Sequence, residues 1–323
     1  MMFALGLVFA AAFAVTFVVT PRLIPKLFEA DISGRDMNKA GEPEVAEMGG
    51  LCIITGFVFA VLLAVAFSSF SLWGEQLDLA GLFAGLSTVL IMALLGIFDD
   101  IFNVKQHVKA ALPLLASLPL VAVNIGETSM NLPVVGVVDF GILFPLILIP
   151  LAITGASNAM NMLAGFNGLE ASLGAVMCGA IGVVSWHTGS VEAAVLAFAM
   201  CGACVAFLRF NWFPARILPG DVGTLSIGAA VAASVIVGNI EKLGLILILL
   251  FFGELYLKMR SRFNAQSWCE REGEMLVCPE RGEVYGLGRL VMYLSGGITE
   301  RNLVVVLVSA EVLFAAIGVS LYF

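Results

Sequence analysis

The sequence predicts an all-α, polytopic membrane protein of about ten transmembrane helices, folded as a single domain over residues 1–323. Of its 323 residues, 60% are hydrophobic and only 12% are charged, which is too little charge to solvate a soluble domain of this size. Ten apolar stretches each approach the length that crosses roughly 30 Å of hydrocarbon. They cover 2–20, 51–68, 79–98, 107–124, 141–158, 170–187, 192–209, 222–240, 243–259 and 302–322.

The distribution of positive charge orients these helices. Of the 16 Lys and Arg residues, all except Lys242 lie in alternate connections, near 21–50, 99–109, 209–221 and 258–301. Cytoplasmic connections are enriched in Lys and Arg, so we expect these four connections inside and both termini outside. The first stretch is interpreted as an uncleaved helix, because Arg22 and Lys26 follow its apolar run and no positive charge precedes it. The net charge of −8 gives no indication of a nucleic-acid partner.

The first cytoplasmic connection includes the polar segment G-R-D-M-N-K-A-G-E-P-E-V-A-E-M-G-G, residues 34–50. Its Gly, Pro and mixed charges indicate a loop without helical periodicity. We expect most of its charges to be solvated.

Two adjacent carboxylates, Asp99 and Asp100, end the third apolar stretch. They lie at a helix C-terminus, where the dipole favours cations, and they repel each other. Successive helical residues diverge by about 100°, so only one of the two can face a given site squarely. A bound cation or the nearby Lys109 would relieve this conflict, and we therefore expect a functional role.

Amide side chains mark the inner end of the fifth stretch. Asn158 and Asn161 are spaced to share one helix face, and Gly165 then interrupts the helix. Amide oxygens at a helix C-terminus suit a hard cation such as Mg²⁺. Asn167 and Glu170 have the spacing of a capping box for the next helix, a structural role that is compatible with a functional one.

Asp221 opens the eighth stretch, behind a rigid turn that contains Pro214, Pro219 and Gly220. Alone it would be either a helix N-cap or a ligand. Because the other carboxylates and amides lie on the same membrane face, a Mg²⁺ site that uses Asp221 is the simpler interpretation. Mg²⁺ is typically held by one or two protein oxygens together with substrate phosphates.

The last cytoplasmic loop, 258–301, places Arg260 and Arg262 just beyond the ninth stretch. Two Arg at this spacing suit either a polyanionic ligand or anionic lipid headgroups. The alternating segment 274–278 suggests a small hairpin or an extended arm. The cysteines indicate neither zinc nor disulfides, because Cys201 and Cys204 have no second ligand pair at metal spacing.

Taken together, these motifs resemble the polyprenyl-phosphate N-acetylhexosamine-1-phosphate transferase superfamily, glycosyltransferase family 4. The resemblance rests on Asp99-Asp100 with Lys109, on N-A-M-N-M-L-A-G-F-N-G-L-E at 158–170, on N-W-F-P through G-D at 211–221, and on E-R-N at 300–302. Bacterial members typically carry Asp where this chain has Ala164. The L-A-G form and the short last loop resemble the archaeal and eukaryotic branch, which makes dolichyl-diphosphate-N-acetylglucosamine.

The resemblance implies the following roles. Asp99, Asp100 and Lys109 would be catalytic; Asn161 and Asp221 would hold Mg²⁺, or Mn²⁺ in its place; and Glu47, Asn158, Asn167, Leu218, Arg260 and Arg262 would contact substrate.

The implied reaction transfers N-acetylglucosamine 1-phosphate from a UDP-N-acetylhexosamine to a polyprenyl or dolichyl phosphate at the cytoplasmic face of the cell membrane, with release of UMP. This is the first membrane step in the synthesis of lipid-linked N-glycan precursors. A phospho-N-acetylmuramoyl-pentapeptide-type transferase is the alternative within the family, and a membrane transporter is the alternative from another class. Transporters tend to place charges near the bilayer midplane on broken helices, whereas here the mid-span candidates are few, chiefly Glu311. The oligomeric state is left open, a homodimer included.

Overall fold

The computed structural model describes residues 2–72, 76–102, 104–132, 136–262, 270–278 and 283–323. It confirms a helical membrane protein, since eight of its helices within these ranges are long and apolar enough to cross a bilayer. Seven are continuous α-helices, and in the eighth a π-helical turn, η1 (Phe144–Leu148), leads into α7 (Ile149–Met162). The seven are α1 (Met2–Glu29), α2 (Gly50–Ser69), α3 (Leu79–Phe102), α8 (Leu169–Thr188), α9 (Val191–Asn211), α10 (Gly220–Gly238) and α14 (Glu300–Ser320).

The other two predicted spans consist of consecutive short helices. The fourth comprises α4 (Gln106–Ala111), α5 (Pro113–Ala116) and α6 (Leu118–Val123), and each break is followed by a proline, Pro113 or Pro119. Proline has no N–H for a helical hydrogen bond, which accounts for these interruptions. The ninth comprises α11 (Glu241–Leu247) and α12 (Leu249–Arg260), which meet at Ile248.

The predicted boundaries were wrong at three other helices. The helix predicted to end at residue 20 continues to Glu29 through two prolines. The helix predicted over 79–98 continues to Phe102, and the helix predicted over 141–158 runs three to four residues later.

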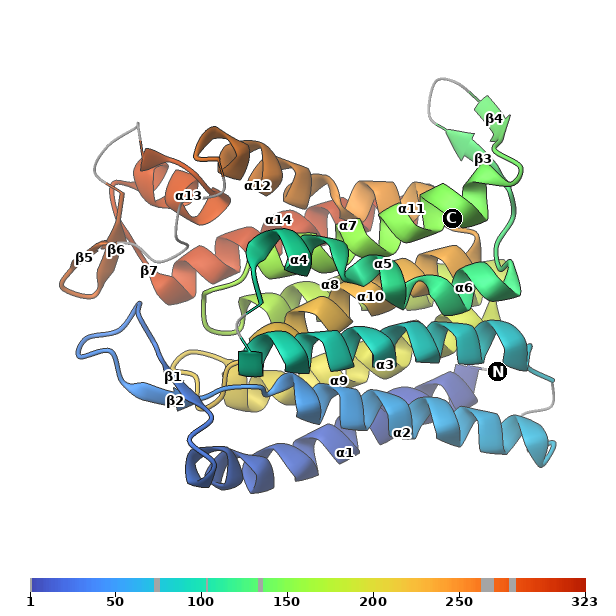
Figure 1. Cartoon of the computed structure of the whole chain (residues 1–323), viewed down its shortest axis with the longest axis horizontal. Coiled ribbons are helices and arrows are strands. Elements are labelled where there is room, and N and C mark those ends of the chain that lie inside the picture. Colours follow the sequence, from blue (N-terminus) through green and yellow to red (C-terminus); the bar gives the residue numbers. More distant parts are fainter. Residues whose placement is uncertain (1, 73–75, 103, 133–135, 263–269, 279–282) are drawn as a thin grey trace.

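Short strands lie at both ends of the bundle, and one further helix lies at one of these ends. At one end, β1 (Ser33–Arg35) pairs with β2 (Glu44–Ala46). At the same end, β5 (Glu270–Glu272), β6 (Met275–Val277) and β7 (Ile298–Thr299) form a sheet in that order, which confirms the predicted hairpin, and α13 (Leu287–Ser295) lies beside it (Figure 1). At the other end, β3 (Ser129–Leu132) pairs with β4 (Gly136–Asp139), and both chain termini lie there (Figure 1).

Helix α10 is the buried centre of the bundle and packs against α2, α3, α7, α8 and α9. Two glycines let its neighbours approach backbone to backbone. A Cβ on Gly96 of α3 would lie 2.4 Å from the Cα of Val222, and a Cβ on Gly228 would lie 2.4 Å from the carbonyl oxygen of Ala156 in α7. Small residues permit such close helix packing in membranes. The ends of α3 and α7 are thereby held beside the first turn of α10.

Candidate active site

A polar cavity of about 600 Å³ opens beside the first turn of α10, at the end of the bundle that carries β1 and β2. Its walls come from four segments far apart in sequence: the β1–β2 region, the end of α3, residues 161–170 and residues 218–224. Six of the eleven residues predicted from sequence line it, namely Glu47, Asp100, Asn161, Asn167, Leu218 and Asp221.

Asp221 is not a helix cap. Helix α10 begins at Gly220, its N-cap is Pro219, and no side chain of its own segment caps it. The carboxylate of Asp221 instead accepts hydrogen bonds from the Lys109 ammonium and from the side-chain amide of Asn161. Of the two interpretations that the sequence left open, the structure excludes the N-cap.

The two neighbouring aspartates of α3 have different partners. Asp99 is 5% exposed, and its Oδ2 lies 2.6 Å from Lys109 Nζ. Asp100 accepts hydrogen bonds from the backbone N–H groups of Asp221 at 2.8 Å and Val222 at 3.0 Å. Asp100 therefore caps α10 from another helix, and its negative charge lies at the positive end of the α10 dipole, where it is favourable.

The site carries an excess of negative charge. The carboxylates of Asp99 and Asp221 share the ammonium of Lys109, while Asp100 and Glu47 add acidic groups to the cavity wall. Burial, and secondarily the charge of Asp221, raises the pKa of Glu47 above its ordinary value. A polyanionic ligand would be repelled here unless a cation accompanied it.

The donor atoms suit a hard divalent cation. Carboxylate and amide oxygens are the groups that Mg²⁺ prefers, and the side chains of Asp221 and Asn161 are in direct contact. Among the described residues, no group of three or more His, Cys, Asp and Glu side chains could hold a metal ion. A site completed by substrate phosphates needs no such group.

Asn158 and Asn161, which were predicted to share a helix face, lie against different cavities. Asn158 donates to the carbonyl oxygens of Thr154 at 2.9 Å and Ala110 at 3.3 Å. It lines an apolar groove of about 590 Å³ rather than the polar cavity. Helix α7 therefore forms part of both walls, with the groove on one side and the polar cavity on the other.

The apolar groove runs along α7, α10, α11 and α12. Met162 and Asn158 lie at its end near the polar cavity, and Phe140 and Met130 of the β3–β4 region lie at its other end. Almost all of its lining is apolar, so it suits a long hydrocarbon chain.

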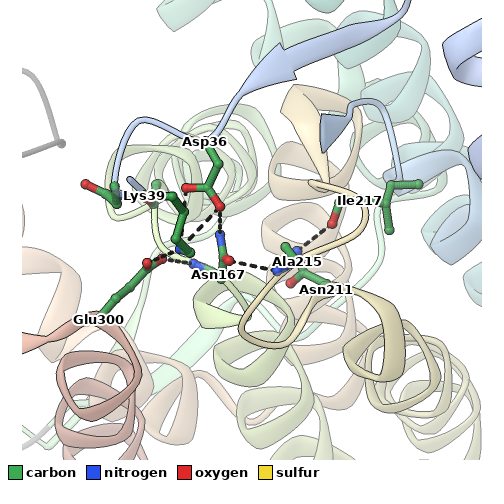
Figure 2. A network of polar contacts seen from close by, with 9 residues as sticks. Asp36, Lys39, Asn167, Asn211, Ala215, Ile217 and Glu300 are labelled. Atoms are coloured by element: carbon green, nitrogen blue, oxygen red, sulfur yellow. Dashed lines mark hydrogen bonds and ion pairs between the residues drawn. The ribbon is translucent and has the colours of Figure 1, made fainter. Parts of the chain in front are cut away.

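A buried ionic cluster forms part of the cavity wall, and sequence reasoning missed it. The ammonium of Lys39 pairs with Asp36 at 3.2 Å and also with Glu300 (Figure 2). Asn167 Nδ2 donates to Asp36 at 3.0 Å, and its backbone N–H donates to Glu300 at 2.7 Å. The prediction that the charges of residues 34–50 are mostly solvated was therefore wrong for Asp36 and Lys39.

The predicted capping box was also wrong. The N-cap of α8 is Gly168, and no side chain caps that helix. Asn167 Oδ1 accepts from the N–H of Ala215 at 2.8 Å, and the Glu170 carboxylate accepts from the N–H of Gly165 at 2.7 Å. Asn167 therefore bonds to distant segments, whereas Glu170 bonds within its own loop.

Arg260 and Arg262, predicted to bind substrate, are not part of the cavity wall among the described residues. Arg260 ends α12 and donates to the carbonyl oxygen of Val284 at 3.5 Å, while Arg262 lies in the following turn and is exposed. Their role stays a prediction. Cys201 and Cys204 are buried, free and remote from the site, whereas Cys269 lies outside the described residues.

Comparison with known proteins identifies the family. The profile of glycosyl transferase family 4 matches residues 82–239. A Saccharolobus solfataricus protein, provisionally named a UDP-N-acetylglucosamine–dolichyl-phosphate N-acetylglucosaminephosphotransferase, is 35% identical over 96% of this chain and 94% of its own length. A Dictyostelium discoideum protein with that name is 28% identical over 93% and 85%. A phospho-N-acetylmuramoyl-pentapeptide-transferase of Halalkalibacterium halodurans is 32% identical over 73% and 75%.

Proposed function

The chain belongs to glycosyl transferase family 4, and we propose that it transfers N-acetylglucosamine 1-phosphate from UDP-N-acetylglucosamine to a dolichyl or polyprenyl phosphate, with release of UMP. The names of the two relatives that match nearly the whole chain support this donor and this acceptor class. The product would be a prenyl-diphospho-N-acetylglucosamine.

The observation that carries this proposal is that two unlike cavities, one apolar and one polar, lie on either side of α7. A prenyl phosphate cannot leave the bilayer and a nucleotide sugar cannot enter it, so their reaction requires a site at the membrane surface. The apolar groove suits the prenyl chain, and the polar cavity suits the nucleotide sugar. We propose that this end of the bundle faces the cytoplasm, because the loops beside the cavity carry most of the Lys and Arg residues.

In the proposed reaction, the protein mainly positions the two substrates and stabilises the negative charge of their phosphates. An oxygen of the lipid phosphate, whose second pKa is about 6, attacks the β-phosphorus of the donor. The bond from that phosphorus to the bridging oxygen breaks, and UMP leaves with the electron pair. Lys109 would stabilise the negative charge on the phosphoryl oxygens during transfer. Asp100 would hold the first turn of α10, and hence Asp221, in place.

We propose that Asp221 and Asn161 hold Mg²⁺. When bound there, the ion supplies the positive charge that allows donor phosphates to enter an acidic cavity. Asn161 now directs its amide nitrogen toward Asp221, but the nitrogen and oxygen of an amide are exchanged by a simple flip.

The alternative donor, UDP-N-acetylmuramoyl-pentapeptide, is favoured by the 32% identical bacterial relative. Two features argue against it. That relative aligns with about three quarters of this chain, whereas the dolichyl-type relatives align with more than nine tenths. Ala164 also lines the polar cavity, at the position where the bacterial members of the family that this chain resembles typically carry Asp.

The test is a transfer assay with purified protein in lipid vesicles. Radiolabelled UDP-N-acetylglucosamine or UDP-N-acetylmuramoyl-pentapeptide is supplied with a prenyl phosphate, with Mg²⁺ or with EDTA. We expect label in lipid and UMP release with the first donor only, and neither product in EDTA. Asp221→Asn should abolish turnover, while Asp139→Asn, an exposed carboxylate in β4 at the far end of the bundle, should not. Preferential use of the peptide-bearing donor would overturn the assignment.

A further inference from the structure

Lys39 joins four segments that are distant in sequence. Its ammonium pairs with Asp36 in its own loop and with Glu300 at the start of α14, and lies 4.4 Å above the ring of Phe213 in the 211–218 loop. Asp36 and Glu300 in turn both bond Asn167, which belongs to the loop before α8 (Figure 2). The exposed fractions of the Asp36, Lys39 and Glu300 side chains are 5%, 13% and 3%.

The bonds of Asn167 fix the orientation of its amide. The carboxylate of Asp36 can only accept a hydrogen bond, so it requires the Asn167 nitrogen. The backbone N–H of Ala215 can only donate, so it requires the Asn167 oxygen. A flip of the amide would lose both bonds at once. Asn167 therefore presents one fixed arrangement of donor and acceptor to the cavity that it lines.

Lys39 and Glu300 do not themselves line that cavity, whereas Asp36 and Asn167 do. They are also separate from the group formed by Lys109 and Asp221. Any effect of Lys39 or Glu300 on a ligand must therefore pass through Asp36, Asn167 and the loop that they hold. Without Lys39, two buried carboxylates would be left without their shared cation, and they would repel each other.

We propose that Lys39 and Glu300 are positioning residues for the donor nucleotide: they hold Asp36 and Asn167 in the arrangement that binds the nucleotide half, away from the reacting phosphates. This inference rests on the proposed function. It separates the cavity into one part that determines donor affinity, at Asn167, and another that determines the rate of transfer, at Asp221. The first part depends on α14, the last helix of the chain, through Glu300.

The test compares Glu300→Gln, Lys39→Gln and Lys39→Arg with the wild-type protein in the same vesicles. Glu300→Gln keeps an oxygen for the N–H of Asn167 but loses the charge that pairs with Lys39. The readouts are the Kd of UMP by calorimetry, the KM for each substrate, kcat and the melting temperature. Glu29→Gln is the matched control, because Lys26 and Glu29 form an ion pair that is more than 60% exposed on the same end of the bundle.

We expect Glu300→Gln and Lys39→Gln to raise the Kd of UMP and the KM for the UDP-sugar on the order of 10-fold or more. The KM for prenyl phosphate should stay at its wild-type value, and kcat should change by less than about 3-fold. Lys39→Arg should restore much of the affinity, because Arg keeps the charge, and the control should match the wild type.

Two results would overturn the proposal. A lowered melting temperature with unchanged Kd and KM in Glu300→Gln would show that the cluster only stabilises the fold, even if Lys39→Gln failed to fold. A fall in kcat at constant KM would place the cluster in the chemical step. Wild-type protein that neither binds UMP nor uses a UDP-sugar would instead refute the proposed function itself.

Discussion

Replacing Asp100 tests whether its carboxylate caps α10. Its carboxylate accepts two hydrogen bonds from the first turn of α10, at 2.8 and 3.0 Å. Loss of a helix cap costs about 0.5–2 kcal/mol, and a buried N–H left without a partner costs about 1–3 kcal/mol. Asp100 borders a polar cavity that admits water, so we take the lower part of these ranges. Asp100→Ala should then reduce the free energy of unfolding by about 2–3 kcal/mol.

Asp100→Asn keeps an oxygen acceptor and should lose only about 1 kcal/mol, the difference between a charged and a neutral acceptor. Denaturant unfolding in mixed micelles measures both variants. Asp78→Ala is the matched control, because Asp78 accepts from the N–H groups of Ala80 and Gly81 at the exposed start of α3. The reasoning is refuted if Asp100→Ala is no more destabilised than Asp78→Ala, or if Asp100→Asn and Asp100→Ala unfold alike.

Three further predictions concern charge and orientation. Lys109→Gln should lower turnover on the order of 10²- to 10³-fold, as expected for a group that stabilises transferring phosphate; a near-normal rate with a lowered melting temperature would identify it as a salt-bridge partner only. Burial raises the pKa of Glu47 in the folded state above its ordinary value of 4.5, so its contribution to stability is fully present below pH 4.5 and is lost as pH rises through the folded-state pKa. Subtracting the unfolding curve of Glu47→Gln from that of wild type across this pH range should show that loss, and a flat difference would contradict it. Cysteines placed at positions 35 and 71 should label from opposite sides of the membrane, position 35 from the cytoplasmic side and position 71 from the external side. Labelling of both positions from the same side would contradict the proposed topology.

Much of the site was predictable because the membrane restricts where polar groups can meet. Helix ends on one face of a bilayer lie in the same thin layer. The side chains at such ends, here Asp99, Asp100, Asn161 and Asp221, are therefore expected to lie near one another. The sequence could not tell which neighbouring aspartate faces which partner. That choice depends on how α3 rotates against α10, which it approaches backbone to backbone at Gly96.

The ionic cluster was unpredictable for a different reason. Lys39 and Glu300 are 261 positions apart, and nothing local in either segment requires a partner. A connecting loop with several charges looks like any solvated connection. Asn167 and Glu170 misled in the opposite way. Their spacing matched a local cap, but Asn167 bonds to Asp36 in a distant segment and Glu170 to Gly165 in its own loop.

The order of elements along the chain bears on how the protein is made. Every helix that supplies Asp99, Asp100, Lys109, Asn161 or Asp221 has been translated once α10 is complete, and most of the helices around α10 precede it. The acidic cluster can therefore assemble before α14 has been made. Glu300 arrives last, at the start of the final helix. If translation stopped before α14, the carboxylates around Lys109 could already be assembled in the membrane, whereas Lys39 would lack its second carboxylate partner, Glu300.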